Sequence, residues 1–414
     1  MHHLLKMILC TVVLLPLFIA AQNGKSKDLP LYQLKLGVFP EENGLEAEVE
    51  IKIKTNYFEN DTLQLYLNPA AIVHNLQTDP SVKLSIAEMD EARNRIILTL
   101  LDKGLEKVTL NMGYSLKIPV DHQVNRITED WVELNIDSFW LPFIDGFPKF
   151  EYEMALQIDS SYTVTTGDQL SKSDANGGWL IVNSIPRLDV SFTAAKKFHT
   201  VQGEFVEVYA LHSDTKIDSV KIVADNVMHF LNGYIDAPKD FREKRKIVVS
   251  PREDVGYSRK NYIVLSDIRN RKAISLAGFL CHEFAHYWFS EANASTKHHW
   301  LSESFAEYLS MVFVREVYGL AEYDANIKEK QKRIENDAKV LADYEERPSY
   351  LAMYVKGPLI LHQFENYLGK EKFKQLINSF VDLNIKTNEE LFELIETRFG
   401  NEAVLELKRL RAII

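Results

Sequence analysis

Cysteine is nearly absent from this 414-residue chain, which contains only Cys10 and Cys281. Cys10 lies in an apolar N-terminal run that we expect to be removed, so one cysteine would remain in the mature protein. A disulfide framework is therefore excluded, and the fold must be stabilised by a hydrophobic core. We expect Cys281 to be buried as a small apolar residue.

An excess of positive charge is also lacking, because 48 lysines and arginines face 59 aspartates and glutamates, for a formal net charge of -11. An acidic surface repels phosphate backbones, which argues against nucleic acid as a partner. After the N-terminal run, no segment is long and apolar enough to cross a bilayer. We expect a soluble protein of two or three globular domains, and the sequence makes no prediction about its oligomeric state.

The N-terminal run has the pattern of a secretory signal peptide. Lys6 precedes the apolar segment from Met7 to Ala21, which ends in small residues and is followed by polar Gln22. We expect residues 1–21 to be cleaved, leaving a mature chain without a stable membrane anchor that is exported to a periplasm or to the outside medium. The alternative is an uncleaved anchor, but the run is short for a membrane span.

Residues 22–195 have the alternating pattern of β-strands. Val49, Ile51 and Ile53 alternate with charged residues, as in a strand with one buried face. The same pattern recurs at 63–67, and 96–101 and 108–114 are further strand candidates. Because turn residues separate these short runs, we predict an N-terminal antiparallel β-sandwich or saddle.

Residues 196–414 are mainly helical in pattern, with a few short strands before residue 270. Apolar residues recur at helical spacing over 219–231 and almost without interruption beyond 270. The charged segment 322–347 is typical of a solvated helix face. We therefore predict an α+β chain with a domain boundary near residue 195.

The strongest chemical signal is the segment His282-Glu283-Phe284-Ala285-His286. Histidines four residues apart lie on one helix face, about one turn from each other, so both imidazoles can bind the same ion. Glu283 points about 100° away around the helix axis, which lets it activate a water molecule without binding the metal. The alternative is a helix with two incidental histidines, which would bury polar groups without partners at a high cost.

A catalytic zinc also needs a third protein ligand and an open position. Ser302 is a candidate N-cap, which places Glu303 in a first helical turn as the predicted third ligand. Glu307 follows one turn later on the same face. It could orient a ligand imidazole by a hydrogen bond, or it could be an ordinary surface carboxylate.

Three blocks of sequence carry a family resemblance: His282-Glu283-x-x-His286, Trp300-Leu301-Ser302-Glu303, and Tyr354-Val355-Lys356-Gly357. In this order they resemble the gluzincin metallopeptidases related to aminopeptidase N. The resemblance implies a thermolysin-like catalytic domain behind a β-sheet domain, one zinc ion bound by the two histidines and Glu303, and a peptide substrate. It also implies that Tyr354 stabilises the oxyanion, with Tyr350 as the second choice.

Two departures from the family pattern concern the substrate. The family's aminopeptidases have Gly-x-Met-Glu-Asn before the zinc helix, and its glutamate helps to bind the substrate's free amine. The corresponding segment here lacks that glutamate, and its candidate substrate contacts are Gly256, Tyr257, Arg259 and Asn261. Arg259 and Lys260 could instead bind a substrate carboxylate, or be surface charges. The large helical C-terminal domain of longer members is also missing, which implies a more open site that accepts larger or N-blocked peptides.

Three functions stay open at this point: an active zinc peptidase, an inactive secreted binding protein with the same fold, and a zinc hydrolase of non-peptide amides or epoxides. The ligands, the base and the tyrosine are all present, which favours the peptidase. Other residues are weaker candidates. His298 and His299 could contact substrate or metal, although loop histidines are usually exposed. We expect Trp131, Phe139 and Trp140 to be interdomain core, with lining of the cleft as the alternative.

Overall fold

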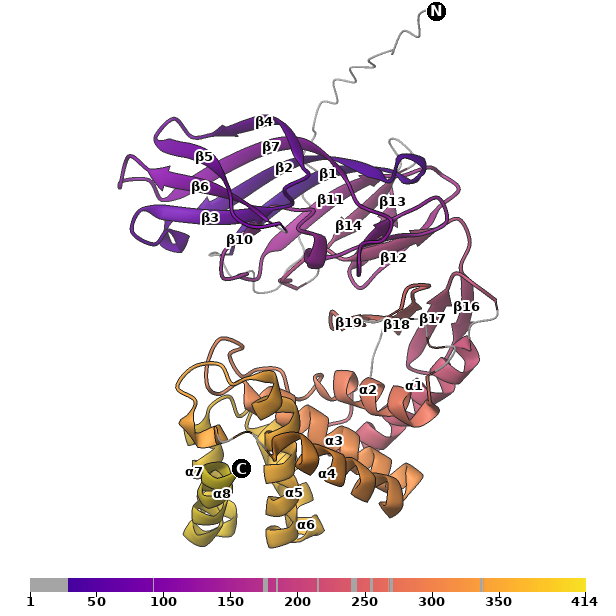
Figure 1. Ribbon diagram of the computed structural model, residues 1–414, viewed down its shortest axis with the longest axis vertical. Helices are drawn as coiled ribbons and strands as arrows, with labels where there is room; N and C mark the ends of the chain where they lie inside the picture. The colour runs from indigo at the N-terminus through magenta and orange to yellow at the C-terminus, as the bar shows by residue number, and fades with distance from the viewer. Residues whose placement is uncertain are drawn as a thin grey trace, which may run out of the picture.

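The computed structural model describes residues 29–414, except 92, 174–177, 184, 214–215, 240–243, 254–255, 267, 269–270, 336 and 338. The predicted signal peptide, residues 1–21, lies outside the described residues. Within the described part, no helix combines the length and the apolar character needed to cross a bilayer. The predicted fold class is confirmed, because a β-rich N-terminal domain is followed by a mainly helical domain with a small sheet (Figure 1).

The N-terminal domain is dominated by a seven-stranded sheet with the strand order β13-β14-β11-β1-β2-β7-β4. Its strands are β1 (Leu31–Phe39), β2 (Gly44–Lys54), β4 (Ile72–Thr78), β7 (Lys107–Lys117), β11 (Glu151–Gln157), β13 (Gln169–Lys172) and β14 (Trp179–Val182). The sheet departs from the antiparallel prediction at one place, since β1 and β11 pair in parallel. Most of the domain's chain lies between these two strands, so the connection is long enough for a parallel pair.

Two four-stranded sheets complete this domain, with the orders β10-β3-β6-β5 and β12-β15-β9-β8. Their strands are β3 (Thr62–Leu67), β5 (Val82–Glu88), β6 (Asn94–Leu100), β8 (Arg126–Ile127), β9 (Val132–Leu134), β10 (Phe143–Ile144), β12 (Thr163–Thr166) and β15 (Phe192–Ala195). Trp140 is buried in the core of this domain and Phe139 packs against that core. The prediction that these two residues form interdomain core is therefore wrong: both lie next to β10, inside the β domain.

The second domain starts with a five-stranded sheet in the order β16-β17-β18-β20-β19. Its strands are β16 (His199–Gln202), β17 (Val206–Ala210), β18 (Arg245–Val249), β19 (Tyr257–Ser258) and β20 (Tyr262–Leu265). Helix α1 (Ile217–Tyr234) connects β17 to β18, which lie side by side in parallel. The short strand β19 is antiparallel to β20 and ends the sheet.

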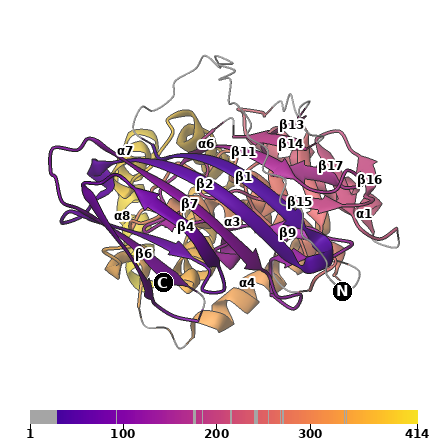
Figure 2. The same cartoon turned by 90° about the horizontal axis from the view of Figure 1, so that it is seen from above.

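The remaining helices of the second domain pack on one side of the molecule, beneath the seven-stranded sheet in the view from above (Figure 2). They are α2 (Ala273–Ala285), α3 (Trp300–Tyr318), α4 (Leu320–Ile334), α5 (Gly357–Leu368), α6 (Lys370–Asp382), α7 (Asn388–Phe399) and α8 (Asn401–Ile413). Gly369 and Gly400 have positive φ and separate consecutive helices, as expected for the residue that tolerates this conformation best. Cys281 is fully buried in the core of this domain, as predicted.

The two domains share a small apolar cluster, here called the interdomain cluster: Val124, Trp131, Ala195, Val248, Tyr257, Tyr262 and Val264. Trp131 lies in it, as predicted. Beside it, Arg252 of the second domain forms an ion pair with Glu133 of β9 at 2.9 Å, and both side chains are completely buried. The Trp131 indole and the Ser250 hydroxyl also donate to Glu133. The carboxylate therefore has a partner for each oxygen, which a buried charge requires.

Candidate metal centre

Helices α2 and α3 bring the predicted metal ligands together. His282 lies in the last turn of α2, and His286 is the first residue after that helix, with a backbone that is still helical. Glu303 lies in the first turn of α3, as predicted. Ser302 does not cap this helix, because α3 begins at Trp300 and so already includes Ser302. Trp300 is held there by its indole, which donates to the Asn388 side chain at 2.7 Å.

The three donor atoms meet at one point. The Nε2 atoms of His282 and His286 are 3.2 Å apart, and Glu303 Oε2 lies 3.4 Å and 3.5 Å from them. Donor atoms around a tetrahedral zinc with bonds of about 2.0–2.2 Å lie roughly 3.3–3.6 Å apart. Two imidazoles and one carboxylate are also a common donor set of catalytic zinc sites. Among the described residues, this is the group of histidine, cysteine and acidic side chains placed to hold a metal ion.

The outer nitrogen of each imidazole contacts an acceptor. His282 Nδ1 lies 3.1 Å from Glu307 Oε2, and His286 Nδ1 lies 2.9 Å from the Phe289 carbonyl oxygen. Because both partners accept, both Nδ1 atoms carry the hydrogen when the imidazoles are neutral, and in that state both Nε2 lone pairs are available to an ion. Glu303 Oε2 is buried and has no hydrogen-bond donor among the described residues. Three acceptors without a donor face one another here, an arrangement that a cation would stabilise.

The electrostatics of the site also favour positive charge. Burial lowers the pKa of His282, but Glu303 and Glu307 outweigh burial and raise it to about 10. Burial raises the pKa of Glu303, but His282, His286 and His299 together hold it well below its ordinary value. The Glu303 carboxylate is therefore ionised at neutral pH, and the site attracts a proton or a metal ion.

His299 is a contact of the site that the sequence favoured only weakly. Its Nε2 lies 3.1 Å from Glu303 Oε1, the carboxylate oxygen that does not face the imidazole pair. His298, its neighbour, turns the other way and accepts from the backbone N–H of Asn388, at the start of α7. Sequence alone offered one signal for His299, namely its position four residues before Glu303, one helical turn away.

Glu283 and Tyr354 lie beside the metal ligands. Glu283 is half-buried on α2, and its charge raises the pKa of both His282 and Tyr354. Tyr354 belongs to a π-helix, η5 (Ala352–Lys356), and its ring stacks on His282 with centroids 5.4 Å apart. Burial and the nearby Glu303 raise the Tyr354 pKa, which keeps the hydroxyl protonated as a donor. Tyr350, the second choice, stacks on the outer face of Tyr354 and is 62% exposed.

The segment with the candidate substrate contacts forms the edge of the five-stranded sheet. Gly256 lies close to β20, since a Cβ there would be 2.9 Å from the Val264 carbonyl oxygen. Tyr257 is buried in the interdomain cluster, and Asn261 is half-buried just before β20. Arg259 donates to Asp189 of the β domain at 2.9 Å, so its guanidinium already has a carboxylate partner.

Comparison with known proteins now identifies the domain. Residues 257–409 match the model of the peptidase family M1 domain. The chain contains a peptidase family M1 domain. This confirms the resemblance to aminopeptidase N-like enzymes, together with zinc metallopeptidase as the enzyme class and zinc as the metal. No curated protein sequence matches the chain.

Solved structures agree with this M1 domain in fold. An M1 zinc metallopeptidase from Deinococcus radiodurans is 16% identical, with a TM-score of 0.65 over 93% of this chain and 94% of that chain. Leukotriene A4 hydrolase from Saccharomyces cerevisiae is 15% identical, with a TM-score of 0.66 over 92% of this chain and 66% of that chain. At such low identity these likenesses establish the fold alone, over both domains.

Proposed function

We propose that this chain hydrolyses peptide bonds with a water molecule activated by Glu283, while Tyr354 stabilises the oxyanion. The observation that carries the proposal is the convergence of His282 Nε2, His286 Nε2 and Glu303 Oε2 within 3.5 Å of one another. A zinc ion held by these three atoms would polarise the scissile carbonyl and lower the pKa of water. Glu283 and Tyr354 then provide a base and a hydrogen-bond donor beside it.

In the proposed mechanism, the Glu283 carboxylate takes a proton from the attacking water and delivers it to the leaving amine. The Tyr354 hydroxyl donates a hydrogen bond to the oxygen that becomes negative in the tetrahedral intermediate. Stacking on His282 and on Tyr350 fixes the plane of the Tyr354 ring, so the hydroxyl does not have to be ordered during the reaction.

A peptide substrate fits the edge strand β19. This strand is the last of its sheet, so its outer backbone groups can pair with an extended peptide. Tyr287 lies just after α2, and its hydroxyl donates to the Lys260 carbonyl at 2.7 Å. This hydrogen bond joins the segment after β19 to the end of α2. A Deinococcus radiodurans neighbour of the same fold is described as bound to the substrate Tyr-Ser-Ala, which supports a peptide as the ligand class.

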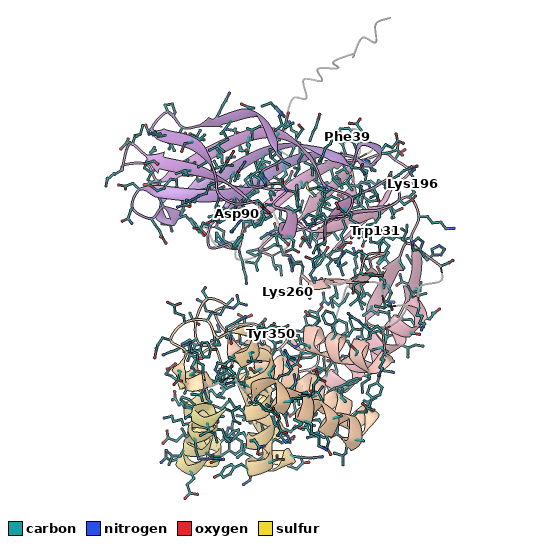
Figure 3. All side chains as sticks on the ribbon, in the orientation of Figure 1. Phe39, Asp90, Trp131, Lys196, Lys260 and Tyr350 are labelled. Atoms are coloured by element: carbon teal, nitrogen blue, oxygen red, sulfur yellow. The ribbon has the colours of Figure 1, made fainter. Side chains whose placement is uncertain are left out.

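The surroundings of β19 favour a substrate without a free amine. The segment from Gly256 to Tyr262 contains no carboxylate, and within it Lys260 is exposed and has a positive φ of 57°. Lys260 and Tyr350 lie on opposite sides of the space between the sheets and the helices (Figure 3). We infer that N-blocked peptides are accepted, and that an exopeptidase requirement for a free amine is absent.

The decisive experiment is a substrate panel with and without a zinc chelator. Matched peptides with a free or an acetylated N-terminus should both be cleaved, and chelation should abolish cleavage until zinc is restored. Cleavage of the free-amine peptides alone would refute the inference about N-blocked substrates. Stoichiometric zinc without cleavage of any peptide would instead support the inactive binding protein.

A second candidate is hydrolysis of a non-peptide substrate, which the fold likeness to leukotriene A4 hydrolase favours. Non-peptide amides and epoxides therefore belong in the same panel. If one of them is turned over and no peptide is, the substrate class proposed here is wrong while the zinc chemistry remains.

We also propose that the protein is exported, on the signal-peptide pattern that ends at Ala21. The mature N-terminus, determined by mass spectrometry on protein from the exporting cell, should be Gln22. An intact Met1 on protein from the cytoplasm would contradict export.

A further inference from the structure

Helix α4 contains a lysine that is buried, although the charged sequence of this helix predicts an exposed one. The segment was expected to be a solvated face, and Lys328 and Lys332 are indeed exposed. Lys330, between them, is only 7% exposed. Burying an ammonium group is costly unless it is paired, so its partners carry information about its role.

Lys330 has two partners, and they belong to different parts of the site. Its Nζ lies 2.6 Å from Glu307 Oε1, while the other oxygen of Glu307 holds His282 Nδ1 at 3.1 Å. The same Nζ donates to the carbonyl oxygen of Tyr354 at 2.8 Å. Lys330 therefore joins the carboxylate that orients a predicted zinc ligand to the backbone of the proposed oxyanion donor.

These contacts close a ring. Lys330 contacts Glu307, Glu307 contacts His282, the His282 ring stacks on Tyr354, and the Tyr354 carbonyl returns to Lys330. In such a ring, the direction of the imidazole and the position of the tyrosine are fixed relative to each other. A neutral side chain at position 330 could not satisfy both acceptors and balance the Glu307 charge.

The hydrogen bond from Lys330 to the Tyr354 carbonyl contacts an unusual stretch of backbone, the π-helix η5. A π-helix is rare, appears mostly as a single wide turn within an α-helix, and is frequent at functional sites. Here two successive carbonyls of η5 are held by other helices: Met353 O accepts from Ser304 Oγ of α3 at 2.7 Å, and Tyr354 O accepts from Lys330 of α4. Lys330 thus fixes the turn that presents the Tyr354 ring.

We propose that Lys330 is a positioning residue that couples metal retention to oxyanion stabilisation through its two contacts. The metal half of the proposal depends only on the zinc site, whereas the turnover half rests on the proposed function of Tyr354. These halves predict separate measurable effects, because Glu307 mediates the first and the Tyr354 carbonyl mediates the second.

The test uses Lys330→Met, which keeps the length of the side chain but removes the charge, with Lys328→Met and Lys332→Met as controls from the same helix. Zinc release into a chromogenic chelator is measured without substrate, and kcat and KM are measured at saturating zinc. Lys330→Met should release zinc about 10–100-fold faster, the usual effect of losing an outer contact of a ligand. Its kcat should fall by up to about 100-fold with little change in KM, as expected for a displaced catalytic group. The controls should match the wild-type protein.

A double-mutant cycle with Glu307→Gln tests whether Lys330 acts on the zinc ion through Glu307. It also keeps the proposal testable if Lys330→Met alone does not fold. Glu307→Gln combined with Lys330→Met leaves no unpaired buried charge, so this protein should fold even if Lys330→Met alone does not. It should release zinc as fast as Glu307→Gln alone, because the two residues act on zinc as one unit. Its kcat should nevertheless be lower than that of Glu307→Gln, because the Tyr354 carbonyl has lost its anchor.

Two results would overturn the proposal: a folded Lys330→Met protein that equals the exposed-lysine controls in zinc release and kcat, or a double mutant with the kcat of Glu307→Gln. If the wild-type protein cleaves no peptide at all, the proposed function fails. Zinc release still tests the metal half in that case, so the two failures are distinguishable.

Discussion

The helical side of the candidate site is positioned from within the second domain, whereas the edge strand β19 pairs with β20 and also contacts the N-terminal domain. The polar contacts of His282 and Glu303 come from α2, α3 and the residues next to these helices, and His282 also stacks on Tyr354 of η5. At β19, in contrast, Arg259 is held by Asp189 and Tyr257 packs in the interdomain cluster beside Trp131. In the proposed function, the chemistry would therefore depend on one domain, whereas the placement of the substrate would depend on both.

The largest expected effect on the chemical side is that of Glu283→Gln. The amide cannot take a proton, so turnover should fall by about 100- to 10,000-fold, the scale of general base catalysis. Zinc content should stay at the wild-type level because Glu283 is not among the converging donor atoms. Steady-state kinetics together with elemental analysis check both parts, and robust activity in this variant would refute the assignment.

Tyr354→Phe should have the next largest effect. It keeps the stacked ring and removes the hydroxyl, so kcat should fall by about 100- to 1,000-fold, as when one oxyanion donor is lost. Tyr350→Phe is the matched control, because it removes the hydroxyl of the exposed neighbouring ring. If the control loses more activity than Tyr354→Phe, the two tyrosines have been assigned in the wrong order.

His299→Ala tests whether a contact within the second domain supports the metal centre. Without the contact at 3.1 Å, Glu303 loses the partner of its outer oxygen, and zinc affinity should drop by about 10- to 100-fold. His298→Ala changes the adjacent histidine, which contacts α7 instead of the site, and should leave zinc affinity unchanged. Competition with a chelator of known affinity measures both, and equal affinities would remove His299 from the site.

The smallest expected effect is that of Asp189→Asn, on the substrate side. Weakening the tie between Asp189 and Arg259 should loosen β19 and raise KM for peptides by up to about tenfold, roughly the loss of one charge-assisted hydrogen bond. Zinc release should not change, because the polar contacts of the metal ligands, within the described part of the chain, come from the second domain. Glu153→Gln, at an exposed position of β11, is the control. A change in zinc release with Asp189→Asn would break the separation between the two sides.

The same contrast explains what could be predicted from the sequence. His282 and His286 converge because helix geometry alone places residues four apart on one face, and the apolar surroundings of α2 made the helix evident. Strands β2 and β20 were likewise visible from alternation or from short apolar runs. Local patterns of this kind define most of the fold and the centre of the site.

Contacts between distant segments could not be predicted in this way. The burial of Lys330 depends on how α4 packs against η5, whereas its sequence neighbours are charged and exposed. The pairing of Arg259 with Asp189 joins residues of two domains. Trp140 is buried in the core of the β domain and not between the domains. Ser302 was expected to cap a helix, but α3 starts two residues earlier, where Trp300 is held by Asn388 of α7.

A crystal structure of the zinc-loaded protein, with anomalous diffraction recorded at the zinc edge, tests the central claim most directly. We expect one anomalous peak, bonded to His282 Nε2, His286 Nε2 and Glu303 Oε2, with a solvent molecule in the fourth position. A peak elsewhere, or a Glu303 carboxylate turned away from the imidazole pair with no other group in its place, would contradict the account.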